Sequence, residues 1–325
     1  MPTKKSALSN YMGPDATFTD EDPYAIATED PFLAKMEQQE LLDPEAPVVP
    51  TFRTLSLHDI RNLPDPEWIV SRFLQADSFA VLYGAPGSTK SFWSLDVALS
   101  IATGLPFHGS EVKKGQVLYA AGEGLRGLKW RIESWLLAHP EANEEDVLSN
   151  LRIIPDVPHL LDETHKARLL NTAEIMADGD TPLILVIVDT WARALVGGDE
   201  NSQKDSGLAV SACDMIRRAT GATTLVVHHT GTEGTRERGS TVLRGAADTS
   251  IMVERNELSQ HTVVTVKKMK DGEAGHKSTY SLKQYGHSVV LAAARGLFDQ
   301  APVQEQVRDR DYYVKRAQAA KESPF

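Results

Sequence analysis

One segment, residues 78–99, constrains the fold more than any other part of the chain. It begins with the apolar run 79–83, which stops at Gly84, and continues through a loop rich in small residues. Beyond the loop, Leu95, Ala98 and Leu99 follow one another at helical spacing. The segment therefore predicts a strand, a tight loop and a helix in direct succession.

The loop nearly matches the phosphate-binding pattern GxxxxGK[ST]. Inward-facing backbone N–H groups and the positive end of the following helix attract a polyphosphate. In this interpretation Lys90 reaches the terminal phosphates of ATP, and the hydroxyl group of Ser91 binds Mg²⁺. The alternative is a surface turn before a core helix. The candidate nucleotide-binding residues are Gly84, Ala85, Pro86, Gly87, Ser88, Thr89, Lys90, Ser91 and Phe92.

Thr89 departs from this pattern, because glycine is usual at its position. A β-branched residue is disfavoured where φ is positive. If the loop needs a positive φ there, we expect Thr89 to be strained.

The composition is typical of a soluble globular protein with enough apolar residues for a core, since 41% of the 325 residues are hydrophobic and 24% are charged. No apolar run reaches the length of a membrane span, and the N-terminus lacks the pattern of a signal peptide. Cys213 is the only cysteine, which excludes an internal disulfide and a cysteine-based zinc site. We therefore expect a cytoplasmic protein that does not contact a membrane.

The negative charge is concentrated near the N-terminus. Residues 1–50 hold ten acidic residues and three lysines, whereas the whole chain has a net charge of −11. We expect residues 1–50 to be a mostly disordered acidic arm, with a short helix at 31–42. The arm is either an inert tail or a segment that docks on a replication partner or mimics nucleic acid. Residues 51–300 are then a single domain, and 301–325 a flexible tail.

Strands alternate with helices along the middle of the chain, which indicates a parallel α/β architecture. We expect strands at 117–121, 151–154, 183–188 and 223–229, and helices at 125–138, 163–177 and 206–220. Shorter strands follow at 251–254, 261–268, 278–282 and 288–291. The predicted fold class is α/β, with a mostly parallel sheet, helices on both faces and an antiparallel C-terminal extension.

Three polar residues stand at the C-terminal ends of predicted strands, the edge where open α/β sheets bind ligands. Asp189 ends a buried apolar run and is the candidate Mg²⁺ residue. Glu123, between two glycines, is the candidate base for the attacking water, or else an acid that opens a helix. His229 is the candidate sensor of the γ-phosphate, although His228 and His229 could instead be a core pair.

Several motifs together resemble one protein family. The segments 84–91, 121–124, 188–193, 197–201, 227–231 and 238–248 occur in the order seen in RecA-like ATPases similar to plasmid RepA, the hexameric replicative helicases related to DnaB and RecA. The resemblance covers about residues 78–272. It implies a RecA-type core, ATP bound between neighbouring subunits, a homo-oligomeric ring, a hexamer in that family, and single-stranded DNA in its channel.

The resemblance assigns Lys90 and Ser91 to the nucleotide, Glu123 to the catalytic base, Asp189 to Mg²⁺ and His229 to the sensor. The arginine that relatives lend to a neighbour's ATP is not evident at 247–249. Lys268 and Lys270 follow a late strand and are the alternative, since a cation supplied in trans can raise the rate by about 10³–10⁵. The other interpretation of these lysines is a solvated basic strand end.

DNA contact is expected in the segment 230–244, where arginines stand among small polar residues suited to phosphate contacts. The candidate DNA-binding residues are Arg236, Arg238 and Arg244. No aromatic residues alternate with them, so binding should be independent of base sequence and should weaken with salt. The loop 197–205 is acidic apart from Lys204. An acidic loop suits a subunit contact or a metal better than it suits a nucleic-acid backbone.

These observations predict an ATP hydrolase that moves on single-stranded DNA during replication of a phage, a plasmid or another mobile element, as a ring-forming helicase. Two alternatives remain. One is a RecA-like recombinase or strand-annealing ATPase. The other is a nucleotide-gated loader with little hydrolysis, which Thr89 and the missing arginine favour and Glu123 opposes.

Overall fold

The computed structural model describes residues 54–122, 125–229, 241–256 and 258–294. The chain divides into two compact units, 1–66 and 67–325. The described part of the first unit contains one short helix, α2 (Leu57–Arg61), with a capping box at its start. There the Ser56 hydroxyl accepts from the Asp59 N–H, and the Asp59 carboxylate accepts from the Ser56 N–H. The predicted arm 1–50 and tail 301–325 lie outside the described residues.

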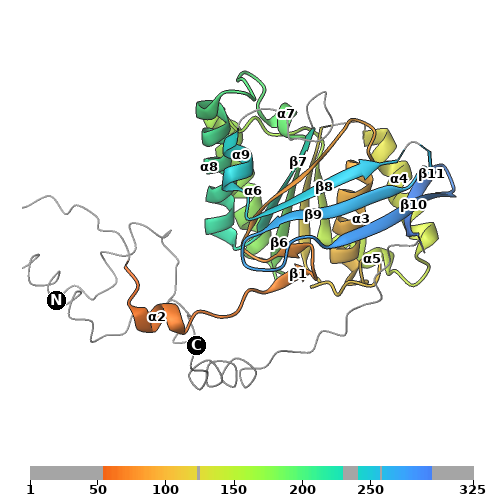
Figure 1. Ribbon diagram of the computed structural model, residues 1–325, viewed down its shortest axis with the longest axis horizontal. Coiled ribbons are helices and arrows are strands. Elements are labelled where there is room, and N and C mark those ends of the chain that lie inside the picture. The colour runs from red at the N-terminus through yellow and green to blue at the C-terminus, as the bar shows by residue number, and fades with distance from the viewer. Residues whose placement is uncertain (1–53, 123–124, 230–240, 257, 295–325) are drawn as a thin grey trace, which may run out of the picture. The chain divides into compact units, whose positions relative to one another are not determined.

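The second unit is built on a nine-stranded sheet (Figure 1). Six neighbouring strands, from β8 to β5, are parallel, and the remaining three pair antiparallel. The predicted fold class is therefore confirmed. The order across the sheet is β11 (Ser288–Ala293), β10 (Lys277–Tyr285), β9 (Thr262–Met269), β8 (Thr249–Arg255), β3 (Phe79–Gly84), β7 (Thr223–His229), β6 (Leu183–Asp189), β4 (Gln116–Ala121) and β5 (Leu151–Ile154).

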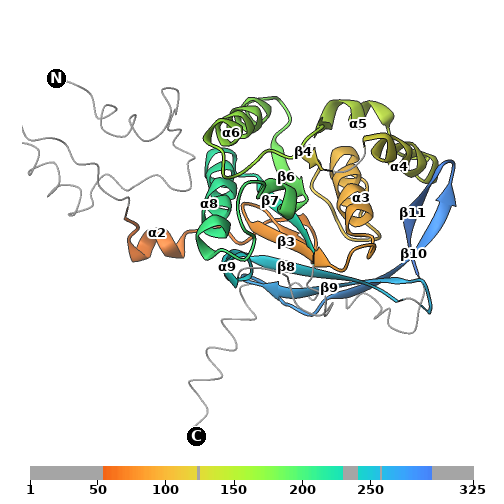
Figure 2. The same cartoon turned by 90° about the horizontal axis from the view of Figure 1, so that it is seen from above.

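Helices cover both faces of the parallel strands (Figure 2). Alternate residues of β3 explain this arrangement, because Ala80 and Leu82 join one buried cluster while Val81 and Tyr83 join the other. The first cluster lies under α3 (Lys90–Thr103), α4 (Leu125–Ala138) and α5 (Glu144–Asn150). The second lies under α6 (Glu163–Ala177), α7 (Trp191–Ala194), α8 (Gln203–Thr220) and α9 (Thr241–Ala246).

A second, two-stranded sheet precedes the phosphate-loop strand. It pairs β1 (Trp68–Val70) with β2 (Leu74–Gln75). At the other end of the chain, the β10–β11 hairpin curls over α4 (Figure 2). The hydroxyl of Ser134 on α4 donates to the Tyr285 carbonyl at 2.6 Å and accepts from the Ser288 N–H at 3.0 Å. One serine side chain thus fastens the antiparallel extension to the helical layer.

The structure corrects one predicted loop. The sequence predicts a loop throughout 230–244, but residues from Thr241 onward form α9, so Arg244 lies on a helix. Gly245 within this helix makes it hard to predict from propensities, because glycine is among the poorest helix formers. Leu243 anchors the helix, since its side chain is buried in the second cluster.

The single cysteine lies in the core. Cys213 on α8 is 1% exposed, and burial raises the pKa of its thiol to about 12. None of the helices in the described ranges is both long and apolar enough to cross a membrane.

Candidate functional site

The loop between β3 and α3 is the tight turn that the sequence predicts. It contains two residues with positive φ, Gly87 at +76° and Thr89 at +74°. Gly84 is fixed by a close contact, because a Cβ atom there would lie 2.1 Å from the carbonyl oxygen of Val253 on β8. Glycine is therefore favoured at position 87 by the positive φ and at position 84 by the close approach of β8.

The side chain of Lys90 folds back over the start of the loop. Its ammonium group donates to the carbonyl oxygens of Gly84 at 2.9 Å and Ala85 at 2.8 Å, and the residue is buried. The hydroxyl of Ser88 is also buried and has no hydrogen-bond partner in the described part of the chain. A buried cation beside an unsatisfied hydroxyl, at the start of a helix, suits a bound phosphate group.

Thr89 is strained, as predicted. It adopts the left-handed conformation, which costs a residue other than glycine about 1–2 kcal/mol. Its carbonyl oxygen accepts the first two hydrogen bonds of α3, from the N–H groups of Phe92 and Trp93, both at 3.0 Å. Its hydroxyl shares a buried hydrogen bond of 2.9 Å with the hydroxyl of Thr262 on β9.

The C-terminal ends of the parallel strands bring the candidate residues to one edge. Asp189 ends β6 and is buried, and its carbonyl accepts from the N–H of Gly122 at 2.5 Å. His229 ends β7 directly beside Gly84 in the parallel register. Lys90, Asp189 and His229 therefore share the edge where β3 ends. Glu123, which follows Gly122, lies outside the described residues, and its role stays a prediction.

The two histidines alternate as expected along β7. His228 is 1% exposed and pairs in register with Tyr83, whereas His229 is partly exposed at the end of the strand. This position agrees with His229, rather than His228, as the residue that faces a ligand. The sensor role itself stays a prediction.

Tyr119, which no sequence motif marks, connects the phosphate-loop helix to Asp189. Its hydroxyl donates to Asp189 Oδ2 at 2.8 Å and lies 2.9 Å from the hydroxyl of Ser94 on α3. Burial and then the negative charge of Asp189 raise the pKa of this phenol well above 10, so it remains a donor. A tyrosine in an apolar strand resembles a core residue, and only its polar hydroxyl indicates a further role.

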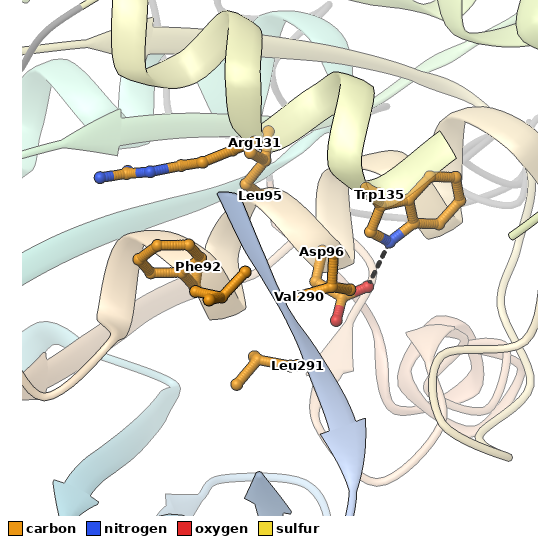
Figure 3. A pocket seen from close by; sticks show the side chains of 8 residues that line it. Phe92, Leu95, Asp96, Arg131, Trp135, Val290 and Leu291 are labelled. Atoms are coloured by element: carbon orange, nitrogen blue, oxygen red, sulfur yellow. Dashed lines mark hydrogen bonds between the residues drawn. The ribbon is translucent and has the colours of Figure 1, made fainter. Parts of the chain in front are cut away.

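A second cation lies beside the first turn of α3. The guanidinium of Arg131 on α4 lies over the ring of Phe92, 4.4 Å from its centroid (Figure 3). Both residues line a small pocket of about 10 Å³, too small for more than a water molecule. At the far side of this pocket the Trp135 indole donates to the buried carboxylate of Asp96 at 2.7 Å (Figure 3). Arg131 falls in a helix with no motif, so nothing in the sequence distinguishes it.

Lys268 and Lys270 lie at the opposite end of the strands from the phosphate loop. β8 runs parallel to β3 and β9 runs back beside it, so Lys268 pairs in register with Ser250 near the start of β8. Its ammonium donates to the carbonyls of Arg244, Gly245 and Ala247 at the end of α9. Lys270 forms an ion pair of 3.2 Å with Asp248.

These positions bear on the predicted roles of the basic residues. Neither Lys268 nor Lys270 is near the phosphate loop of its own chain, so contact with a triphosphate would need a second copy. Arg244 is exposed on α9, while Arg236 and Arg238 lie outside the described residues. All of these functional assignments stay predictions.

The strand, the loop and the helix around Lys90, with Asp189 at the end of β6 in the same parallel sheet, define a P-loop nucleotide-binding domain. Residues 46–235 match a sequence family described as an AAA domain, and this match covers more than half of the chain. The protein belongs to this AAA domain family, and its core is that of a P-loop ATPase.

Among solved structures, the chain is similar to one described as the crystal structure of the RadB recombinase. The two are 15% identical, with a TM-score of 0.47 over 64% of this chain and 88% of that one. No curated protein matches the sequence.

Proposed function

We propose that this protein is an ATP-dependent motor that moves on single-stranded DNA as a ring-forming replicative helicase of a phage, a plasmid or another mobile element. One observation carries the nucleotide part of the proposal. Buried Lys90 and buried Asp189 converge on the edge of the sheet where the phosphate loop begins. A cation and a carboxylate at that edge are the groups that hold a triphosphate and its magnesium ion.

The residues of the site fit magnesium and ATP. Ser91 and Asp189 would hold Mg²⁺, which neutralises charge on the phosphate oxygens when it is bound. Lys90 would exchange its two loop carbonyls for phosphate oxygens, and the unsatisfied hydroxyl of Ser88 would gain a partner. Glu123 would take the proton of the attacking water, and His229 would respond to the γ-phosphate.

The DNA part of the proposal rests on the order of motifs in the sequence. Arg236, Arg238 and Arg244 would contact the backbone of the strand without reading bases. Lys268 or Lys270 would complete the site of a neighbouring subunit in a ring, proposed to have six members. The acidic arm would then be free to dock on a replication partner.

Nucleotide hydrolysis tests the proposal first. We expect wild-type protein to hydrolyse ATP slowly alone and faster with single-stranded DNA. Glu123→Gln should bind ATP normally but lose at least about 100-fold in rate, because it lacks the base. Lys90→Ala should lose nucleotide affinity. The measurements are steady-state phosphate release and calorimetric binding of a non-hydrolysable ATP analogue with Mg²⁺.

Two results would contradict the assignments. Unchanged affinity in Lys90→Ala would remove the phosphate-loop interpretation. Equal and negligible rates in wild-type protein and Glu123→Gln, with DNA present, would favour the nucleotide-gated loader, in which ATP fixes an assembly and is hardly hydrolysed.

A second pair of assays separates the motor from a recombinase with the same fold. Unwinding of a forked duplex without joint-molecule formation supports the helicase. Joint molecules or annealed strands without unwinding would assign the protein to the recombinase or strand-annealing class instead.

A further inference from the structure

The phosphate loop holds a residue that is poorly suited to its conformation. Thr89 has φ +74° and ψ +19°, in the left-handed region that favours glycine. The same loop uses a glycine at its other left-handed position, Gly87, where there is open space around the backbone. Something other than intrinsic preference must therefore keep Thr89 in place.

The structure shows one side-chain contact that can do so. The hydroxyl of Thr89 meets the hydroxyl of Thr262 at 2.9 Å, and the two residues are 7% and 0% exposed. Thr262 is the first residue of β9, which lies next to β8 in the sheet. A buried hydroxyl without a partner is costly, so this pairing favours the one backbone conformation in which the two groups meet.

The conformation of Thr89 also sets the start of α3. Its carbonyl accepts from Phe92 and Trp93, and its own side chain makes no hydrogen bond to the helix. Lys90 and Ser91 follow directly, so a change of φ at Thr89 would redirect both groups. Position 89 therefore determines where the lysine and the hydroxyl point.

We infer that Thr262 is a positioning residue for nucleotide binding, whose hydroxyl holds Thr89 in the left-handed conformation that the phosphate loop requires. The inference rests on the proposed function, since it assigns to the same loop a support from β9. It also explains how the loop accepts a residue other than glycine at position 89. With glycine at that position, the support would be redundant.

A double-mutant cycle tests this inference. Thr262→Val removes the hydroxyl and keeps the branched shape, and it should weaken binding of a non-hydrolysable ATP analogue with Mg²⁺ by about 2- to 10-fold, the loss expected for one buried hydrogen bond. In the Thr89→Gly background the same substitution should change affinity by less than about 2-fold, because no hydroxyl is left at position 89 to lose its partner. Calorimetry measures affinity, and thermal melting without nucleotide measures stability.

The chain offers two matched controls. Thr262→Ser keeps the hydroxyl and should bind like the wild type. Thr265→Val removes the buried hydroxyl of another β9 threonine, which has no hydrogen-bond partner among the described residues, and should also leave affinity unchanged.

The outcomes distinguish the inference from the proposed function. Equal losses of affinity in the wild-type and Thr89→Gly backgrounds, or no loss in either, would overturn the inference while wild-type binding still supported a nucleotide site. Failure of the wild-type protein to bind the analogue at all would overturn the proposed function and, with it, this inference.

Discussion

The hydroxyl of Tyr119 shows how a single residue of a buried strand can orient a buried carboxylate. It lies between Ser94 on the helix after the phosphate loop and Asp189 at the end of β6. Because its pKa is raised well above 10 by burial, it stays protonated and holds the carboxylate in one orientation. The contact joins the helix after the phosphate loop to the end of β6.

Replacement of Tyr119 by phenylalanine should therefore affect both stability and magnesium use. A hydrogen bond to a charged group contributes about 1.5–3 kcal/mol, so we expect a loss of that order in the free energy of unfolding. The magnesium concentration at half-maximal ATP hydrolysis should rise, because Asp189 is less well oriented. Urea denaturation and a magnesium titration measure the two effects.

Tyr285→Phe on β10 is the matched control. This tyrosine is partly exposed, and none of the contacts described for it involves its hydroxyl, so both measurements should match the wild type. A Tyr119→Phe variant with unchanged stability and magnesium dependence would contradict the orienting role.

At the scale of elements, the carbonyl groups at the end of α9 are capped by a residue of β9. The ammonium of Lys268 on β9 donates to three carbonyl groups at the end of the helix. A cation at a helix C-terminus opposes the negative end of the helix dipole. The neighbouring Lys270 instead makes an exposed ion pair with Asp248.

We expect Lys268→Met to lower the free energy of unfolding by about 1–2 kcal/mol, because it removes a partly buried cap. Lys270→Met should lower it by less than about 1 kcal/mol, since exposed ion pairs contribute little. Urea denaturation of the two variants side by side measures the difference. Equal losses would show that the contact with α9 is not a stabilising cap.

These elements also show what sequence reasoning can and cannot find. The helices 125–138 and 163–177 and the strand 151–154 have the predicted bounds, because their apolar patterns are long or sharply bounded. Lys90 and Asp189 can be chosen as candidate site residues because a motif and a strand end mark them. Tyr119 and Thr262 cannot, since their proposed roles arise from contacts between residues distant in the sequence.

At the scale of the whole molecule, the phosphate loop lies at one end of the strands of the sheet, and Lys268 and Lys270 lie at the other end. β3 ends at the loop, whereas β9 ends at Lys268 and Met269, beside the start of β8. A site that uses both ends therefore requires two copies of the chain. Because β8 is parallel to β3 and β9 is antiparallel to β8, the loop and the lysines lie at opposite ends of the strands within one copy.

We accordingly expect the rate of ATP hydrolysis per subunit to rise with protein concentration, because in the proposed function each site is completed only on assembly. Electron microscopy with a non-hydrolysable ATP analogue and an oligonucleotide should show rings. A rate independent of concentration, with single particles of one chain, would contradict a shared site, and filaments would favour the recombinase.

The single cysteine has a practical consequence for following such an assembly. Cys213 is buried in α8 with a thiol pKa of about 12, so native protein offers almost no reactive thiolate at neutral pH. A cysteine introduced at an exposed position, for example in place of Glu273, would then be the sole attachment point for a fluorophore or spin label. The wild-type chain should therefore take up almost no thiol-reactive label.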